Sequence, residues 1–286
     1  MKVGLLLEGG AMRGMYTVGA LDYLMKNNIK VDGIVGVSAG ALFGINYKSK
    51  QPGRALRYNL KYCKKKNYMG FYSLITTGDI MNKKFCFDKL IHELDPIDYD
   101  TFKNSPEDFW AVVTNMETGK AEYIKVDDLT KQEQVEALRA SGSMPFVSKP
   151  VEINGNKYLD GGTADSIPID KIMELGYDKI IVILTRTAGY RKEKGNTTLA
   201  KLKYKKYPNF VKTIENRYLM YNNELDKISK LENDNKIFVI RPSRKVNIKR
   251  IEKNSKRIQE MYDLGVDDVE KSIERFKEYI NYFIVK

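Results

Sequence analysis

The sequence places a serine between two glycines, in the run Gly36-Val37-Ser38-Ala39-Gly40, which is the G-x-S-x-G pattern of a nucleophile elbow. An apolar run at 34–37 precedes Ser38, and a segment with helical character follows from Ala39. At such a strand-to-helix turn, Gly36 and Gly40 allow close packing, and the start of the helix brings backbone N–H groups beside the serine hydroxyl. These residues predict a serine that attacks an acyl carbonyl, and the alternative is a plain tight turn.

The base that would accept the proton of Ser38 is not obvious, because the chain has one histidine, His92. His92 stands beside the apolar stripe of an amphipathic segment, which is more typical of a partly buried surface residue than of a catalytic one. Asp160 ends a strand pattern and is followed by Gly161-Gly162, a turn that lets two loops approach closely. A carboxylate can serve as the base where desolvation raises its pKa or hydrogen bonds orient it. Spacing alone leaves Asp160 open as a base or as part of an Asp-Gly turn.

A glycine-rich stretch, LEGGAMRG at 7–14, follows the first apolar run. Its backbone amides suit either a phosphate or an oxyanion. The spacing Gly9-x-Ala11-x-x-Gly14 approximates a dinucleotide fingerprint, with Asp32 as the acidic residue, so a nucleotide- or phosphate-binding protein with a non-catalytic elbow is the alternative function. However, Asp32 precedes the second predicted strand, whereas a ribose-binding acid belongs at the end of that strand. This position makes the nucleotide interpretation the weaker one.

Composition excludes several classes of protein. Two cysteines and one histidine cannot form a tetrahedral zinc site, so no metal is expected, and a reducing, cytoplasmic location is predicted. No window approaches the roughly 20 apolar residues of a membrane span, and no signal-peptide core is present. The net charge of +12 is compatible with anionic partners, but general compositional bias is the stronger explanation. The basic segment 190–212 is expected to be an irregular, mobile surface stretch that could contact an anionic membrane, and nucleic acid is the less favoured partner.

The pattern of apolar residues predicts an α/β protein with a mainly parallel sheet and helices on both faces. Buried strands are expected at 3–7, 34–37 and 179–185, with a hairpin around the turn Glu117-Thr118-Gly119-Lys120 and a strand ending at Asp160. Helices are expected from Met15, from Ala39, and at 131–140 and 169–175. A further strand is expected at 236–242, followed by helices at 250–262 and 266–283 that Gly265 separates.

Taken together, EGGAMRG, GVSAG, RASGSMP and DGG resemble, in order and spacing, the motifs of the patatin-like phospholipase family of serine lipid acyl hydrolases. The resemblance covers about residues 3–187 and implies a three-layer α/β/α fold. It further implies that Ser38 is the nucleophile, that Asp160 is the base of a Ser-Asp dyad, and that the amides of Gly9, Gly10 and Ala11 form the oxyanion hole. The family usually has glycine where this chain has Ala11, and alanine resists a positive φ.

The resemblance also assigns supporting positions. Arg13 matches a basic position of the family, where it would orient the loop, attract an anionic headgroup or form a structural salt bridge. The other supporting residues are Gly14, Gly36, Gly40, Gly161 and Gly162. We expect a catalytic core at 1–187 and an appended unit at 188–286, whose part after about Lys236 resembles the C-terminal extension of a bacterial cytoplasmic subgroup. The expected activity is hydrolysis of lipid carboxylic esters, with a lipid or acyl ester as the partner and no cofactor, while headgroup, chain length and oligomeric state are left open.

Overall fold

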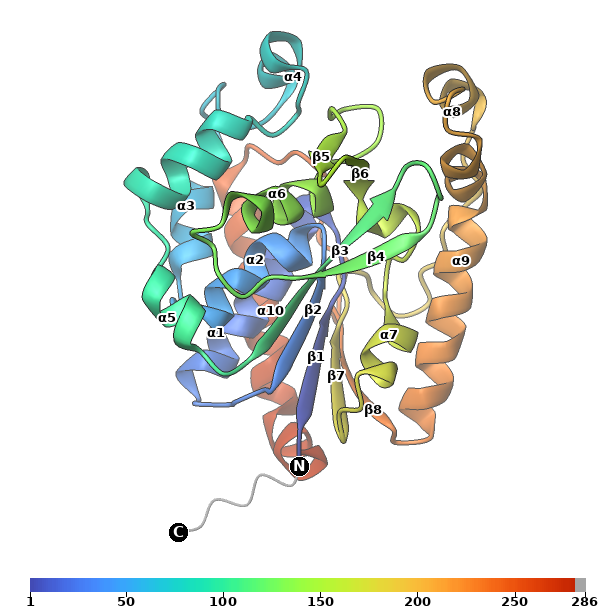
Figure 1. Ribbon diagram of the computed structural model, residues 1–286. Helices are drawn as coiled ribbons and strands as arrows, with labels where there is room; N and C mark the ends of the chain where they lie inside the picture. The colour runs from blue at the N-terminus through green and yellow to red at the C-terminus, as the bar shows by residue number, and fades with distance from the viewer. Residues whose placement is uncertain (281–286) are drawn as a thin grey trace.

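The computed structural model describes residues 1–280. Its eight-stranded sheet has the order β5-β6-β3-β2-β1-β7-β8, and β4 pairs with β3 (Figure 1). The strands are β1 (Val3–Leu7), β2 (Gly33–Val37), β3 (Asp108–Asn115), β4 (Ala121–Lys125), β5 (Val151–Ile153), β6 (Asn156–Asp160), β7 (Lys179–Ile183) and β8 (Ile237–Ile240). Five neighbouring strands run parallel, namely β3, β2, β1, β7 and β8. The other three strands, β4, β5 and β6, form antiparallel pairs. The predicted α/β class with a mainly parallel sheet is confirmed.

Helices cover both faces of this sheet. The longer ones are α1 (Met15–Lys26), α2 (Ala39–Lys48), α3 (Arg54–Tyr62), a π-helix (Lys84–Leu94), α6 (Gln132–Ser141), α9 (Pro208–Asn233) and α10 (Ser255–Tyr279). The shorter ones are α4 (Phe71–Thr77), α5 (Tyr99–Asn104), α7 (Ile169–Glu174), α8 (Thr198–Lys203) and the 3₁₀ turns η1 (Ala11–Gly14) and η3 (Gly161–Thr163).

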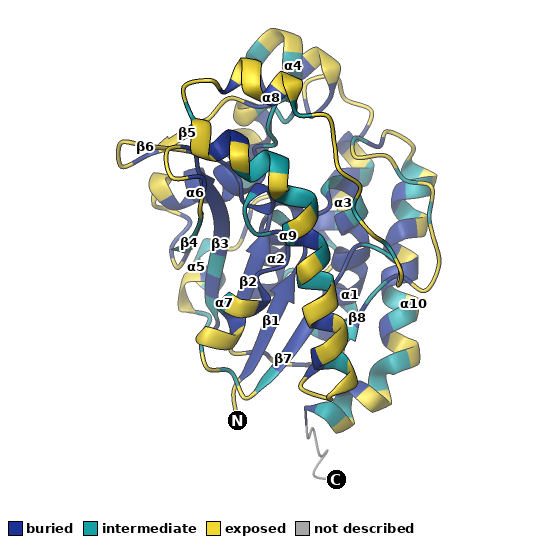
Figure 2. Cartoon of the chain, turned by 90° about the vertical axis from the view of Figure 1, so that its right-hand side faces the viewer, coloured by how far each residue is buried: buried dark blue, intermediate teal, exposed yellow. Residues whose placement is uncertain are grey.

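The two central strands β1 and β2 are apolar throughout and buried on both faces (Figure 2). Alternate side chains of β1 enter different cores: Leu5 and Leu7 pack with α1, α2, α3, α6 and α10, whereas Leu6 packs with α7 and α9. Helices on one face, the sheet, and helices on the other face therefore make the three layers that the resemblance implied.

The predicted break at Gly265 is wrong, because α10 runs continuously through this residue. A Cβ on Gly265 would lie 2.1 Å from the carbonyl oxygen of Tyr16, and a Cβ on Gly19 would lie 2.1 Å from that of Tyr262. The two glycines therefore let α1 and α10 cross in backbone contact. Glycine costs about 1 kcal/mol in a helix interior, and here close packing offsets that cost.

The segment 190–212 is also more ordered than predicted, because it contains α8 and the start of α9. Most of its lysines are exposed, whereas Lys192 is half-buried. Ala200, Tyr204 and Phe210 are buried in a small third core with Met116 and Leu159. The aromatic residues that made the segment look irregular in the sequence are those that attach it to the sheet.

Candidate active site

Ser38 is the single residue between β2 and α2, and its backbone has φ 53° and ψ −119°. A positive φ is strained for a residue with a Cβ, and such strain persists only where the surrounding structure imposes it. Here the neighbouring glycines impose it: a Cβ on Gly36 would lie 2.7 Å from the backbone of Ala41, and one on Gly40 would lie 2.4 Å from the carbonyl oxygen of Leu7. The close approach of α2 to the strands fixes the Ser38 hydroxyl at the carboxyl end of the sheet.

Ser38 and Asp160 are in direct contact, although 122 positions separate them. The Ser38 hydroxyl donates a hydrogen bond to Oδ2 of Asp160 at 2.6 Å, and the N–H of Gly162 donates one to Oδ1 at 2.8 Å. Asp160 ends β6, which pairs with β3, and a Cβ on Gly161 would lie 2.1 Å from the carbonyl oxygen of Val112. The Asp-Gly-Gly turn therefore brings the carboxylate close to β3 and aims it at Ser38.

The carboxyl group of Asp160 is almost fully buried, at 5% exposure. Burial raises its pKa, while the hydrogen bond from Ser38, the nearby guanidinium of Arg217 and the N–H of Gly162 act in the opposite direction. A raised pKa makes a carboxylate a stronger proton acceptor, and the two hydrogen bonds hold it in place. His92 bonds elsewhere, to Tyr99, and these features equip Asp160 to take a proton from Ser38.

The glycine-rich loop after β1 lies against the same serine. A Cβ on Gly9 would lie 3.0 Å from the Cβ of Ser38, and Gly9, Gly10 and Ala11 line one cavity with it. Within residues 1–280 the N–H groups of these three residues have no hydrogen-bond acceptor. Ala11 adopts φ 49°, so alanine takes the left-handed conformation here despite a cost of about 1–2 kcal/mol. The loop therefore offers unpaired amide donors beside the nucleophile candidate.

The positions of Gly14, His92 and Asp32 test three further expectations from the sequence: close packing at the elbow, a histidine base and a dinucleotide site. A Cβ on Gly14 would lie 2.9 Å from that of Ala39, so η1 packs closely on the start of α2. His92 hydrogen-bonds through Nδ1 to the hydroxyl of Tyr99 and lines neither cavity that contains Ser38. Asp32 accepts a hydrogen bond from the N–H of Val3 at 2.6 Å, at the amino end of the strands. The acid that a dinucleotide site requires is therefore at the wrong end of the sheet.

Arg13 forms no structural salt bridge within the described residues. No carboxylate there lies within 4.0 Å of its guanidinium, and its buried Nε has no hydrogen-bond partner. Burial and the neighbouring Arg186 lower the pKa of Arg13 to about 10, although Glu8 acts in the opposite direction. Of the three roles considered from the sequence, the salt bridge is excluded for residues 1–280.

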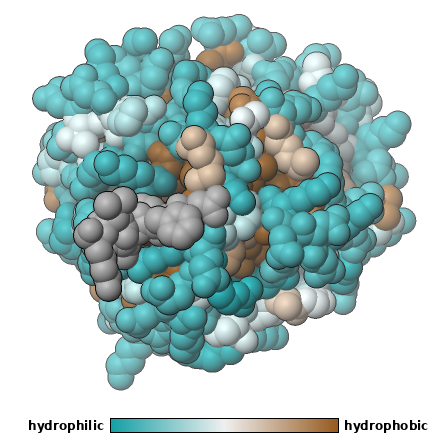
Figure 3. Space-filling model, turned by 90° about the horizontal axis from the view of Figure 1, so that it is seen from below, coloured by the Kyte–Doolittle hydropathy of each residue, from teal (hydrophilic) through white to brown (hydrophobic). Residues whose placement is uncertain are grey.

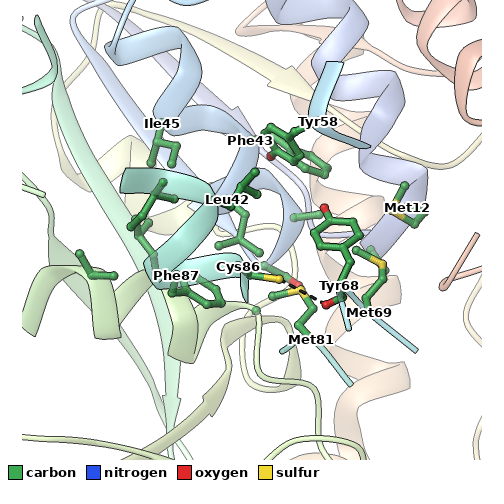
Figure 4. Close-up of a pocket in the computed structure, with 18 of the residues that line it drawn as sticks. Met12, Leu42, Phe43, Ile45, Tyr58, Tyr68, Met69, Met81, Cys86 and Phe87 are labelled. Atoms are coloured by element: carbon green, nitrogen blue, oxygen red, sulfur yellow. Dashed lines mark hydrogen bonds between the residues drawn. The ribbon is translucent and has the colours of Figure 1, made fainter. Parts of the chain in front are cut away.

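Two cavities meet at Ser38. One is apolar and extends between α2, α3, α6 and the π-helix (Figure 4). The other is polar and contains Asp160, the glycine-rich loop and part of α9. Side chains that point into the apolar cavity include Met12, Leu42, Phe43, Tyr68, Met81 and Phe87. An ester with one long apolar arm and one polar arm could therefore place its carbonyl at Ser38.

Sequence reasoning missed four basic residues of the polar cavity. They are Arg186, Lys192, Arg217 and Arg250. A signal for Arg217 does exist in the sequence, because Arg217, Tyr221 and Glu224 recur at helical spacing on the inner face of α9. The other three lie in loops, where no periodicity could have pointed to them.

Comparison with known proteins agrees with this geometry. Residues 5–173, more than half of the chain, match the family described as Patatin-like phospholipase, and residues 207–281 match a domain of unknown function, DUF6363. The mainly parallel sheet and the serine at a strand-to-helix turn place the chain among α/β proteins with a nucleophile-elbow turn. The chain belongs to the patatin-like phospholipase family.

Individual relatives cover the same region. YjjU of Escherichia coli K12, described as uncharacterized, is 28% identical over 64% of this chain and 52% of its own length. The neuropathy target esterase sws of Drosophila melanogaster is 30% identical over 64% of this chain and 13% of its own length, and the lysophospholipase nte1 of Aspergillus niger is 29% identical over 64% and 12%. Among solved structures, VipD from Legionella pneumophila aligns with a TM-score of 0.44 and 12% identity, covering 94% of this chain and 67% of that one. The chain thus spans about half or less of the length of these curated relatives.

Proposed function

We propose that this protein is a serine lipid acyl hydrolase of the phospholipase A, lysophospholipase or carboxylesterase type, which cleaves carboxylic esters through an acyl-enzyme. The observation that carries the proposal is the 2.6 Å hydrogen bond from Ser38 to the buried carboxylate of Asp160, at the junction of an apolar and a polar cavity. Membership of the patatin-like phospholipase family and the names of two relatives, an esterase and a lysophospholipase, support it.

In the first half of the reaction, Oγ of Ser38 attacks the ester carbonyl carbon while its proton passes to Oδ2 of Asp160. The carbonyl oxygen becomes an oxyanion, which the free N–H groups of Gly9, Gly10 and Ala11 are available to stabilise. The tetrahedral intermediate then collapses. The bond to the alcohol oxygen breaks, that oxygen takes the proton from Asp160, and the acyl group remains on Ser38.

In the second half, water takes the place of the departed alcohol. Asp160 accepts a proton from the water as its oxygen attacks the acyl carbonyl, and the same amides are available to the second oxyanion. Collapse releases the fatty acid and returns the proton to Oγ of Ser38. The same two side chains thus act in both halves, and no further co-reactant is required.

The most direct test uses a mixed lipid extract incubated with the wild type and with Ser38→Ala. Mass spectrometry is expected to find free fatty acids and deacylated lipids with the wild type and not with the variant. Equal product formation by both proteins would refute the assignment of Ser38.

The apolar cavity is proposed to hold the acyl chain, which gives a prediction about chain length. Leu42 lies in α2 one turn after Ser38, is partly exposed, and points into the cavity (Figure 4). The larger side chain of Leu42→Trp would fill part of the cavity and displace methylene groups of a long acyl chain. Because each methylene that is no longer buried loses about 0.8 kcal/mol of binding free energy, kcat/KM for a C12 ester is expected to fall about tenfold or more. Turnover of a C4 ester by the same variant is the internal control. A uniform loss across chain lengths would contradict this role.

We also propose that the protein docks on an anionic bilayer through its α4/α8 tip, defined as the exposed apolar residues Phe71, Tyr72 and Ile75 of α4 and Leu199 and Leu202 of α8. Their exposures are 72%, 53%, 68%, 57% and 72%, respectively. Both helices lie at the end of the molecule toward which the parallel strands point (Figures 1 and 2). The opposite end is mainly hydrophilic (Figure 3). No helix within residues 1–280 has the length and apolar character needed to cross a bilayer.

The surroundings of the α4/α8 tip fit that partner. Lys149 and Lys253 lie at the two ends of α4, and Lys205 and Lys206 follow α8. Cations that border exposed apolar side chains are typical of surfaces that bind anionic lipid. The strand pairing of Met69 with Met81 supports α4, and both side chains line the apolar cavity, so docking would bring lipid to the cavity.

The variant Phe71→Ser/Ile75→Ser/Leu199→Ser/Leu202→Ser is expected to lose at least about tenfold in affinity for anionic vesicles, because it removes most of the exposed apolar area of the tip. Cosedimentation with vesicles measures this loss, and turnover of a water-soluble ester monitors the fold. Met173→Ser is the matched control, because Met173 is 41% exposed on α7, away from the tip. Unchanged vesicle binding by the quadruple variant would exclude the tip as the docking surface.

A further inference from the structure

Five cationic side chains converge on the polar cavity beside Ser38. Arg13 comes from η1, Arg186 and Lys192 from the chain after β7, Arg217 from α9 and Arg250 from the loop before α10. None of the five forms an ion pair within 4.0 Å in the part of the chain that the structure describes, whereas seventeen other ion pairs occur there. The chain therefore leaves the cations of this one cavity unpaired.

The carboxylates that face the cavity already have other partners. Glu8 accepts hydrogen bonds from the hydroxyl of Tyr221 at 2.6 Å and from the N–H and hydroxyl of Thr185 at 2.5 and 3.0 Å. Asp160 is held by Ser38 and Gly162, as described above. Neither carboxylate forms a salt bridge with any of the five cations, so the cavity carries an excess of positive charge.

This excess has a physical cost. Burial, together with the charges of Arg217 and Arg250, lowers the pKa of Lys192 to about 8. The buried Nε of Arg13 lacks any acceptor among residues 1–280. Unpaired cations removed from water are unfavourable unless an anion with several acceptor oxygens pairs with them. Among the five cations, Arg217 donates through Nε to the carbonyl oxygen of Gly162, which carries no full negative charge. The buried Arg54 is different, because the carboxylate of Asp95 lies 3.6 Å from its Nε and Asn46, Asp95 and Pro96 accept its N–H groups.

We propose that the polar cavity binds the phosphate of the substrate's headgroup, so that the substrate class is an anionic glycerophospholipid or its lyso form. The proposal rests on the hydrolase function proposed above. Its distinctive element is that Arg217 and Arg250, which belong to the region of unknown function at 207–281, supply part of the headgroup site.

The arrangement of the two cavities fits such a substrate. In a glycerophospholipid the ester carbonyl lies between the acyl chain and the phosphate, and Ser38 lies between the apolar cavity and the cationic one. The cavity has about 170 Å³ open to water-sized groups, compared with the roughly 10–15 Å³ that one water requires. A choline headgroup would add another cation. The rings of Tyr190 and Tyr221, which could have received that cation, already lie 4.2 and 4.8 Å from Arg186 and Lys192. Net-anionic headgroups are therefore favoured over zwitterionic ones.

The test compares three substrates with the same acyl chain, each below its critical micelle concentration: lysophosphatidate, lysophosphatidylcholine and monoacylglycerol. The wild type is expected to show a kcat/KM for lysophosphatidate about tenfold to a hundredfold above that for monoacylglycerol, as is typical of charge-assisted hydrogen bonds to phosphate. In Lys192→Gln and in Arg250→Gln this ratio is expected to fall about tenfold. Lys192→Arg, which keeps the charge, is expected to retain most of the ratio.

Lys236→Gln is the matched control, because it removes one exposed positive charge just before β8, away from the site, and its ratio should equal that of the wild type. Inorganic phosphate and glycerol 3-phosphate serve as competitors. Phosphate inhibition without any advantage of lysophosphatidate over monoacylglycerol would overturn the headgroup assignment in favour of a site for free phosphate. Hydrolysis of all three lipids at similar rates would overturn this inference and leave the hydrolase intact, whereas no hydrolysis of any ester would refute both.

Discussion

Ser38→Ala is expected to abolish hydrolysis of a chromogenic acyl ester, with a loss in kcat of about 10⁶-fold, the size seen when the nucleophile of a serine hydrolase is removed. Without Oγ there is no atom to form the acyl-enzyme, and the amides and cavities can give only weak residual catalysis of attack by water. The variant should also lose covalent labelling by a fluorophosphonate, which mass spectrometry of the intact protein measures as a fixed mass increase.

The fold should tolerate this substitution. Alanine and serine carry the same Cβ, so the substitution adds no steric demand to the backbone of the elbow at φ 53° and ψ −119°. Ser143→Ala is the matched control, because Ser143 is also buried but its hydroxyl donates to the carbonyl of Arg139. Undiminished labelling of Ser38→Ala would place the reactive serine elsewhere, and a comparable loss in Ser143→Ala would indicate general damage to the site.

The elbow could be predicted from the sequence because its determinants are contiguous. A run of apolar residues, two small residues around Ser38 and a following helical segment all act within about ten positions, and the close contacts of Gly36 and Gly40 are consequences of that local chain path. The parallel sheet was predictable for a similar reason, since strands buried on both faces are continuous apolar runs. Asp160 was identifiable only by its turn and by resemblance, because β6 reaches Ser38 through pairing with β3.

The polar cavity could not be predicted in the same way. Lys192, Arg217 and Arg250 are distant in sequence and meet only because α9 crosses one face of the sheet while the loop before α10 closes over the glycine-rich loop, where Met12 N–H bonds to the carbonyl of Arg250. In a chain with 49 lysines and arginines, nothing local distinguishes these three from solvated surface charges. Gly265 is a second example, because glycine is typical both of a helix end and of a close crossing of two helices, and the sequence alone does not distinguish them.

Asp160→Asn is the second substitution with a large expected effect. We expect kcat to fall about 10⁴-fold, which is the upper end of the range for removing a general base. Asparagine can still accept the hydrogen bond from Gly162, so the turn should persist, but its amide cannot take the proton of Ser38. Because Ser38 remains, slow fluorophosphonate labelling should continue at a strongly reduced rate. His92→Ala is the control for the identity of the base and should retain nearly all activity. A loss of several orders of magnitude in His92→Ala, or normal turnover by Asp160→Asn, would restore histidine as the base.

The raised pKa of Asp160 gives this prediction a pH signature. The reaction needs the ionised carboxylate, so wild-type kcat/KM should fall as the pH drops through a value above the ordinary pKa of aspartate, about 3.9.

The raised pKa of Asp160 affects the stability of the fold in the opposite direction: ionisation of the carboxylate favours activity but disfavours folding. Because the folded-state pKa is higher than the unfolded one, folding favours the protonated form, and this contribution is lost as the pH rises through the folded-state value. Asp160→Asn should therefore unfold at a higher temperature than the wild type at pH 7, with the difference shrinking toward pH 4, as thermal denaturation can measure. A lower midpoint at pH 7 would mean that attraction to the neighbouring arginines, and not burial, dominates at this carboxylate.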